Sequence, residues 1–201
     1  MTPSHIAREL RRHSPFTAVG ALSGAVVMVL VAVLHVPQTT STVLFWSLHP
    51  LHVLLSALVT AAMYRRHSHG RLGWTLLVGY VGSVGVATLS DSVIPFVGEW
   101  LLQIPNRGIH LGFIEKWWLV NPLAALGILI GYVWPHTRVP HAGHVFLSTW
   151  ASLFHMTMAM DGSPDPILGA LIVVFLFLAV WIPCCTSDIV LPLMFEKRDD
   201  H

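Results

Sequence analysis

Six apolar stretches alternate with short polar segments along the chain. Each stretch has about the 20 residues that a helix needs to cross the hydrocarbon core of a bilayer. The segments between them contain Gly, Pro, Asn, Asp or Ser, which are typical of turns. The expected membrane-spanning helices cover residues 16–35, 43–64, 72–97, 117–134, 143–160 and 167–195.

Polar residues within these stretches form two motifs, and each motif occurs twice. The pattern H-x-x-H-V-x-L-S begins at His49 and again at His141, and the pattern S-D-x-V-x-P-x-x-x-E begins at Ser90 and again at Ser187. The motifs keep the same order and a similar spacing, which favours an internal duplication over coincidence. Each copy contains three expected spans, so the second copy would enter the membrane from the opposite side. Inverted-topology repeats of this kind are common in secondary transporters.

The expected fold is therefore an all-α integral membrane protein with six transmembrane helices, arranged as two inverted-topology three-helix repeats. Its expected parts are a cytoplasmic N-terminal segment (1–15), the first repeat (16–103), an outer connecting loop (104–116), the second repeat (117–196) and a cytoplasmic tail (197–201).

The composition agrees with a chain that has lipid as its solvent. Hydrophobic residues make up 54% of the 201 residues and charged residues only 10%, against about 25% charged residues in soluble domains. The formal net charge of +1 gives no case for nucleic-acid binding. The expected partners are the lipid bilayer and a metal ion, and the sequence leaves a homo-oligomer open.

Basic residues set the expected orientation, because Lys and Arg concentrate on the cytoplasmic side of membrane proteins. With the N-terminus inside, only Arg107 and Lys116 of the eleven basic residues lie outside. We therefore expect a multi-pass protein of the cytoplasmic (inner) or another cell membrane, with both termini in the cytoplasm.

Histidine is the candidate ligand, since the chain holds 13 of them and ionisable groups inside a membrane are costly and usually functional. Residues three or four apart share one face of a helix, so the two imidazoles of each H-x-x-H motif can point at one ion. A carboxylate would complete a mixed nitrogen and oxygen site suited to zinc, iron, manganese, cobalt or nickel, which the sequence does not distinguish. The expected metal ligands are His49, His52, Asp91, His141, His144 and Asp188.

Proline gives the second motif its chemistry. Pro95 and Pro192 each follow an aspartate by four residues, and proline cannot donate the helical hydrogen bond to the carbonyl four residues earlier. Asp91 and Asp188 are therefore expected to offer a freed carbonyl oxygen beside the carboxylate.

Further side chains are secondary candidates for the site. The glutamates that end the second motif are expected at the surface, where they would meet an incoming ion. The thiols would make the inner site softer than the outer one. The secondary candidates are His35, Glu99, His136, His155, Cys184, Cys185 and Glu196.

Because the repeats are inverted, the sequence predicts two similar polar clusters on opposite sides of the midplane. The favoured function is a small transporter or channel for a divalent metal cation, coupled to protons through histidine. An integral-membrane metalloenzyme acting on lipid is an alternative, so enzymatic activity stays undecided and a non-enzymatic role is favoured. A haem-binding electron-transfer subunit fits less well, because His49 and His52 point the same way. Helix packing is the structural alternative for the serines of these motifs.

Overall fold

The structure is a computed structural model, and it describes residues 3–67, 72–135, 138–162 and 164–185. This part of the chain is helical and contains no strand. The helices are α1 (Pro3–Val33), α2 (Gln38–His67), α3 (Leu72–Tyr80), η1 (Val81–Gly85), α4 (Val86–Thr88), η2 (Leu89–Val93), α5 (Ile94–Leu101), α6 (Gly112–Glu115), α7 (Trp117–Val133), α8 (Arg138–Met158) and α9 (Pro166–Cys185).

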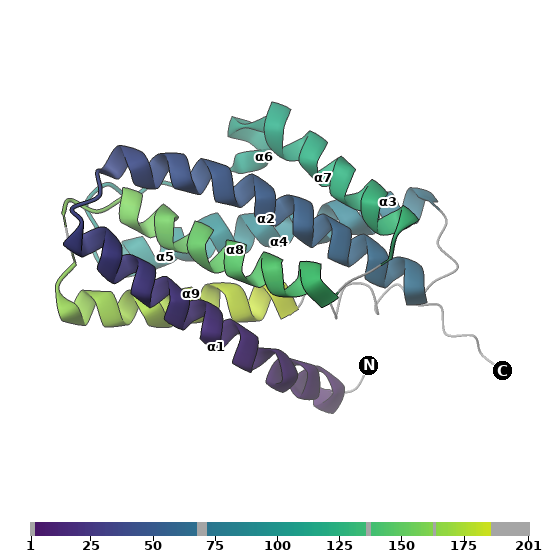
Figure 1. The fold of residues 1–201 in the computed structure, drawn as a ribbon, viewed down its shortest axis with the longest axis horizontal. Helices are drawn as coiled ribbons and strands as arrows, with labels where there is room; N and C mark the ends of the chain where they lie inside the picture. The colour runs from purple at the N-terminus through teal and green to yellow at the C-terminus, as the bar shows by residue number, and fades with distance from the viewer. Residues whose placement is uncertain (1–2, 68–71, 136–137, 163, 186–201) are drawn as a thin grey trace.

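Two long helices, α2 and α8, form the centre of the bundle (Figure 1). Helix α7 packs on the side of α2, whereas α1 and α9 pack on α8 and on each other. The helical segment from α3 to α5 lies behind both central helices and contacts them along its length (Figure 1). Anything placed between α2, α8 and this segment is therefore enclosed on three sides.

The central helices run antiparallel. The side-chain amide of Gln38, at the start of α2, donates a hydrogen bond to the carbonyl of Met158 at the end of α8. Farther along α2, the ring of His52 lies against the ring of His144, which is near the start of α8. This register brings polar residues of both helices to the same level.

Glycine allows α7 to approach α2 closely. Gly127 and Gly131 stand four residues apart on α7, and a Cβ atom at either position would overlap a backbone carbonyl of α2, at Leu54 or Leu58. Small residues at this spacing are typical of tightly packed helices in membranes.

The same spacing occurs where α1 meets α8. Gly20 and Gly24 both face the side chain of Thr149, and a Cβ atom at Gly20 would lie 3.0 Å from its Oγ1. Both α1 and α7 therefore pack by a Gly-x-x-x-Gly face against a central helix.

Polar and apolar side chains have the reverse of their usual distribution in a water-soluble protein. Fully buried side chains include four histidines, one aspartate and one glutamate, namely His49, His52, His144, His155, Asp91 and Glu99. Large apolar side chains on the outer helices are mostly exposed, for example Leu22 at 64%, Val133 at 78% and Ile167 at 75%. Contiguous apolar surface on this scale marks contact with a membrane or a partner.

Three of the described helices are long and apolar enough to cross a membrane: Gln38–Arg66, Leu72–Leu101 and Pro166–Pro183. Two shorter apolar helices, Thr17–Val33 and Trp117–Val133, coincide with two further expected spans. Helix α8 does not reach the same hydropathy among the described residues, because its inward face carries a row of polar side chains: His144, Ser148, Thr149, Ser152, His155 and Thr157. The length and composition of these helices indicate membrane association.

The segment from Leu72 to Leu101 is a helix interrupted by two wide turns. Both η1 and η2 are π-helical, with backbone hydrogen bonds that span five residues instead of four. Single π turns in helices occur frequently at functional sites. The second wide turn contains Ser90, Asp91 and Ser92, all fully buried.

Candidate functional site

Asp91 is the centre of a buried polar cluster. One of its carboxylate oxygens, Oδ2, lies 2.9 Å from Nδ1 of His49 and 2.7 Å from Nδ1 of His52. An ionised carboxylate only accepts hydrogen bonds, so both rings carry their shared hydrogen on Nδ1. The structure thus brings together three residues that the sequence proposed as ligands, with two imidazole nitrogens converging on one oxygen.

The other carboxylate oxygen, Oδ1, is held by hydroxyl groups. Ser90 Oγ donates to it at 2.7 Å and Ser148 Oγ donates at 2.9 Å. Asp91 therefore accepts four hydrogen bonds from α2, α8 and its own helix. Such bonding is what makes a buried carboxylate tolerable, because burying an unpaired charge is very costly.

The wide turn η2 and Pro95 together leave the carbonyl of Ser90 without a helical hydrogen bond. The N–H of Ile94 donates to the carbonyl of Leu89, five residues earlier, so the next donor in this register would be residue 95. Proline has no N–H, and the carbonyl left without its helical partner is that of Ser90. Ser152 Oγ donates to it at 2.9 Å. The carbonyl of Ser90 is therefore freed and bonded by Ser152, and the freed carbonyl expected at Asp91 stays a prediction.

His144 does not form part of a separate cluster on the far side of the molecule. Its ring lies parallel to that of His52, at an interplanar angle of 5° and a centroid distance of 5.7 Å. Ser148, one turn along the same helix, donates to Asp91. The expected separation of the two H-x-x-H motifs is therefore wrong for these residues, because α2 and α8 pack directly against each other at this level.

The ring of His49 is enclosed on two sides. Phe45, one turn earlier on α2, stacks on it at a centroid distance of 5.5 Å. Gly112 of α6 lies against the other ring nitrogen, since a Cβ atom at Gly112 would overlap Nε2 of His49. This nitrogen is buried and has no hydrogen-bond partner. Among the described residues, the hydrogen bonding of this ring is therefore confined to its Nδ1 side, toward Asp91.

Glu99 and His155 form a second buried pair. Glu99 Oε1 lies 2.7 Å from His155 Nδ1, and both side chains are fully buried. The backbone N–H of Gly108 donates to Glu99 Oε2 at 3.3 Å. The expectation that Glu99 sits at the surface was wrong, because the loop after α5 folds back over this end of the helix.

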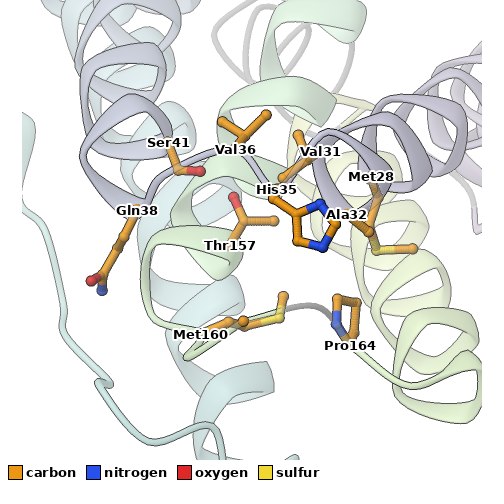
Figure 2. Close-up of a pocket in the computed structure, with 11 residues that line it drawn as sticks. Met28, Val31, Ala32, His35, Val36, Gln38, Ser41, Thr157, Met160 and Pro164 are labelled. Atoms are coloured by element: carbon orange, nitrogen blue, oxygen red, sulfur yellow. The ribbon is translucent and has the colours of Figure 1, made fainter.

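His35 lies in a different place from these groups. It has a positive φ of 48° and lines a pocket with residues from α1, α2 and the end of α8. Figure 2 shows its ring among Met28, Thr157 and Met160. None of His49, His52 and Asp91 lines this pocket, so the structure does not bring His35 into the Asp91 cluster.

Six other candidate ligands have side chains outside the described part of the structure. His141 lies in α8, and Cys184 and Cys185 lie at the end of α9, but their side chains are outside the described part of the structure. The remaining three, His136, Asp188 and Glu196, fall outside the described residues altogether.

The arrangement is a set of hydrogen bonds shared around one carboxylate. Within residues 3–67, 72–135, 138–162 and 164–185, no group of three or more His, Cys, Asp or Glu side chains stands ready to hold a metal ion. Two imidazoles and one carboxylate that share hydrogen bonds at a place closed to solvent can exchange protons.

Sequence reasoning missed two kinds of residue at this site. It placed Ser148 on the polar face of its helix, with helix packing as the alternative, and did not identify it as a hydrogen-bond donor to Asp91. It also missed Phe45, which precedes His49 by four residues and therefore shares its face of the helix.

Comparisons with protein family models, with curated proteins and with solved structures find no match to this chain.

Proposed function

We propose that this chain is a small membrane transporter or channel for a divalent metal cation, which binds between His49, His52 and Asp91 in exchange for protons. The observation that carries the proposal is the convergence of two Nδ1 atoms on a single buried carboxylate oxygen. Buried ionisable groups in membrane helices usually mark the path of an ion or a proton.

The distances suit an exchange of proton for cation. Nitrogen and oxygen ligands lie about 2.0–2.2 Å from zinc and similar ions, and two such ligands of one tetrahedral ion are roughly 3.4 Å apart. The nitrogens of His49 and His52 lie 2.9 and 2.7 Å from Oδ2 of Asp91. A side-chain shift of about half an ångström would open the position that the hydrogen now occupies.

The surroundings of His49 favour binding on this side of the ring. Gly112 closes off Nε2 of His49, so an ion has access only through Nδ1. The ring hydrogen on Nδ1 and a cation compete for the same direction, which makes cation binding and protonation of this nitrogen mutually exclusive. A cation that binds at Nδ1 of a doubly protonated ring therefore releases one proton, and this release is the basis of the proposed coupling.

We also propose that the six expected spans form two inverted repeats. In an inverted repeat the two copies are related by a two-fold axis in the membrane plane, and equivalent residues meet where the axis passes between antiparallel helices. His52 and His144 are equivalent in the H-x-x-H motifs, and their rings stack between α2 and α8.

The pattern of helix contacts supports the same axis. Helix α7 packs on α2 as α1 packs on α8, and α3 packs on α7 as α9 packs on α1. The Gly-x-x-x-Gly faces of α1 and α7 occupy corresponding places in these contacts. This correspondence extends the duplication beyond the two sequence motifs.

A binding and transport experiment tests the function. Purified protein would be dialysed against Zn²⁺, Mn²⁺, Co²⁺ or Ni²⁺, and uptake of the bound ion would be followed in liposomes. We expect Asp91→Asn and His49→Ala/His52→Ala to lose binding and uptake, because each removes ligands from the point of convergence. Asp161→Asn is the matched control, since Asp161 is exposed and bonds only to Asn106 among the described contacts. Equal uptake by wild type and Asp91→Asn would refute the proposal.

A further inference from the structure

The Glu99–His155 pair is a second buried ionisable site, and binding at Asp91 does not use it. Both side chains are fully buried and share a hydrogen bond of 2.7 Å. Nε2 of His155 is buried without a hydrogen-bond partner. A buried carboxylate and imidazole in this relation exchange a proton readily, because one is the acid and the other the base of the same hydrogen bond.

This pair connects to the surface through the loop that follows α5. The ring of His110 lies 5.4 Å from the ring of His155, measured between centroids. Nδ1 of His110 is 3.2 Å from Oε2 of Glu115, and these two side chains are 33% and 40% exposed. A series of ionisable groups therefore runs from the surface to Glu99.

Toward the interior of the bundle, the ring of Phe45 separates the Glu99–His155 pair from the Asp91 cluster. Phe45 is fully buried, stacks on His49 at 5.5 Å and meets His155 edge-on at 5.2 Å. A phenyl ring neither donates nor accepts a conventional hydrogen bond, so it interrupts a chain of hydrogen bonds between the two histidines.

The loop is also tied directly to the wide turn. Ser92, next to Asp91 in η2, donates a hydrogen bond of 2.5 Å to the backbone carbonyl of His110. A change in the backbone around Asp91 would therefore reach the loop that carries the exposed end of the series.

We propose that Glu99 and His155 form a proton-transfer site between the Asp91 cluster and the surface at His110 and Glu115, and that Phe45 is its gate. This inference rests on the proposed function, in which a cation displaces protons at Asp91. In this proposal the displaced proton comes from a doubly protonated His49, which loses the hydrogen on Nδ1 and keeps the one on Nε2. The proton crosses through water admitted when Phe45 turns aside, and is taken up by the Glu99–His155 hydrogen bond. The pair then releases a proton to His110 and the solvent, so protons are conserved and no oxidant or reductant is needed.

The ionisable groups of the pair and its surroundings come from six parts of the chain. Helix α5 supplies Glu99 and α8 supplies His155, the loop supplies His110, and α6 supplies Glu115. The remaining groups are on the far side of Phe45, where α2 supplies His49 and η2 supplies Asp91. The exposed carboxylate of Glu115 would hold a proton close to His110 before its release.

The test follows protons and cations at once. Liposomes containing the protein would carry one dye sensitive to pH and one sensitive to Zn²⁺, and a Zn²⁺ gradient would be applied. We expect Glu99→Gln and His155→Gln to bind Zn²⁺ at equilibrium as wild type does, while Zn²⁺-driven proton release falls roughly 100-fold, as for loss of a general acid or base. Asp161→Asn is again the control for the change of an acid to its amide.

The gate is tested separately from the transfer site. We expect Phe45→Ala to conduct protons without Zn²⁺, whereas Phe45→Leu keeps an apolar side chain in place and stays closed. Monodispersity in detergent identifies any variant that fails to fold. Glu99→Gln and His155→Gln report on the transfer site, and the two Phe45 variants report on the gate, so the two parts of the proposal are tested independently.

The outcomes separate this inference from the proposed function. Wild type that neither binds Zn²⁺ nor moves it would overturn both. Normal Zn²⁺ transport and proton release in Glu99→Gln and His155→Gln would overturn the transfer site alone. Loss of equilibrium Zn²⁺ binding in these two folded variants would also overturn it, because the pair would then belong to the cation site. A Phe45→Ala variant that stays proton-tight would overturn the gate.

Discussion

The imidazole rings of His52 and His144 are parallel to within 5°, with their centroids 5.7 Å apart. These residues hold the same position in two copies of one motif, 92 residues apart in the sequence. Their contact joins the two halves of the chain at the level of Asp91. A site built in this way depends on both halves, because α2 supplies two imidazoles and α8 supplies a hydroxyl donor and a ring.

Replacement of Ser148 by alanine tests the contribution of the second half. Ser148→Ala removes one of the two hydroxyl donors to Oδ1 of Asp91, and a hydrogen bond to a charged group contributes about 1.5–3 kcal/mol to stability. We expect the free energy of unfolding in detergent to fall by about this amount. Ser47→Ala is the control, since that hydroxyl bonds only to a carbonyl one turn earlier in its own helix. Equal stability of the two variants would contradict a structural role for the contact with Asp91.

Part of this site could be predicted from the sequence because local geometry determines it. The spacing of His49 and His52 places both on one face of a helix, and the duplicated aspartate motif identified Asp91 as their partner. The burial of Glu99 could not be predicted, since it depends on how the loop with Gly108 returns over α5.

Long-range packing explains the other differences. The meeting of His52 and His144 depends on the register of α2 against α8, which no local pattern encodes. The wide turn at Asp91 likewise results from tertiary contacts, since Ser152 satisfies the carbonyl of Ser90 that the turn leaves free. Helical periodicity alone predicts an ordinary α-helical turn there, and so it did not identify the carbonyl of Ser90 as a freed acceptor.

Ligand-induced stabilisation gives a measure of binding that does not require transport. A ligand that binds only the folded state at 100 times its Kd stabilises that state by about 2.7 kcal/mol. We expect Zn²⁺ to raise the thermal midpoint of wild type, and to leave that of Asp91→Asn unchanged, because the variant lacks the shared carboxylate. Removal of Zn²⁺ by a chelator should restore the original midpoint. The same shift in Asp91→Asn as in wild type would place the ion elsewhere.

Transmembrane topology tests the inverted repeat. In the proposed arrangement Arg66 lies on the cytoplasmic side and Arg107 on the outer side, and both are exposed. Single cysteines at these positions, in a chain with Cys184 and Cys185 replaced by serine, would be treated with a membrane-impermeant thiol reagent in intact cells. We expect Arg107→Cys to react at once and Arg66→Cys only after the cells are opened. Labelling of both positions in intact cells would contradict a membrane crossing between Arg66 and Arg107, and with it three spans in the first repeat.

Gly112 provides the sharpest test of the site's geometry, because a single methyl group distinguishes the outcomes. A Cβ atom there would overlap Nε2 of His49 and would lie 2.6 Å from its Cδ2, so Gly112→Ala must displace the ring. Overpacking of this kind typically costs about 1–3 kcal/mol, and the displaced Nδ1 would lose its alignment with Asp91. We therefore expect Gly112→Ala to weaken Zn²⁺ binding as well as lowering stability. Gly73→Ala is the matched control, since a Cβ atom at Gly73 meets nothing within 4 Å and alanine is favoured over glycine in a helix by up to about 1 kcal/mol. If Gly112→Ala bound Zn²⁺ as Gly73→Ala does, His49 would not be a ligand in the position that the structure gives it.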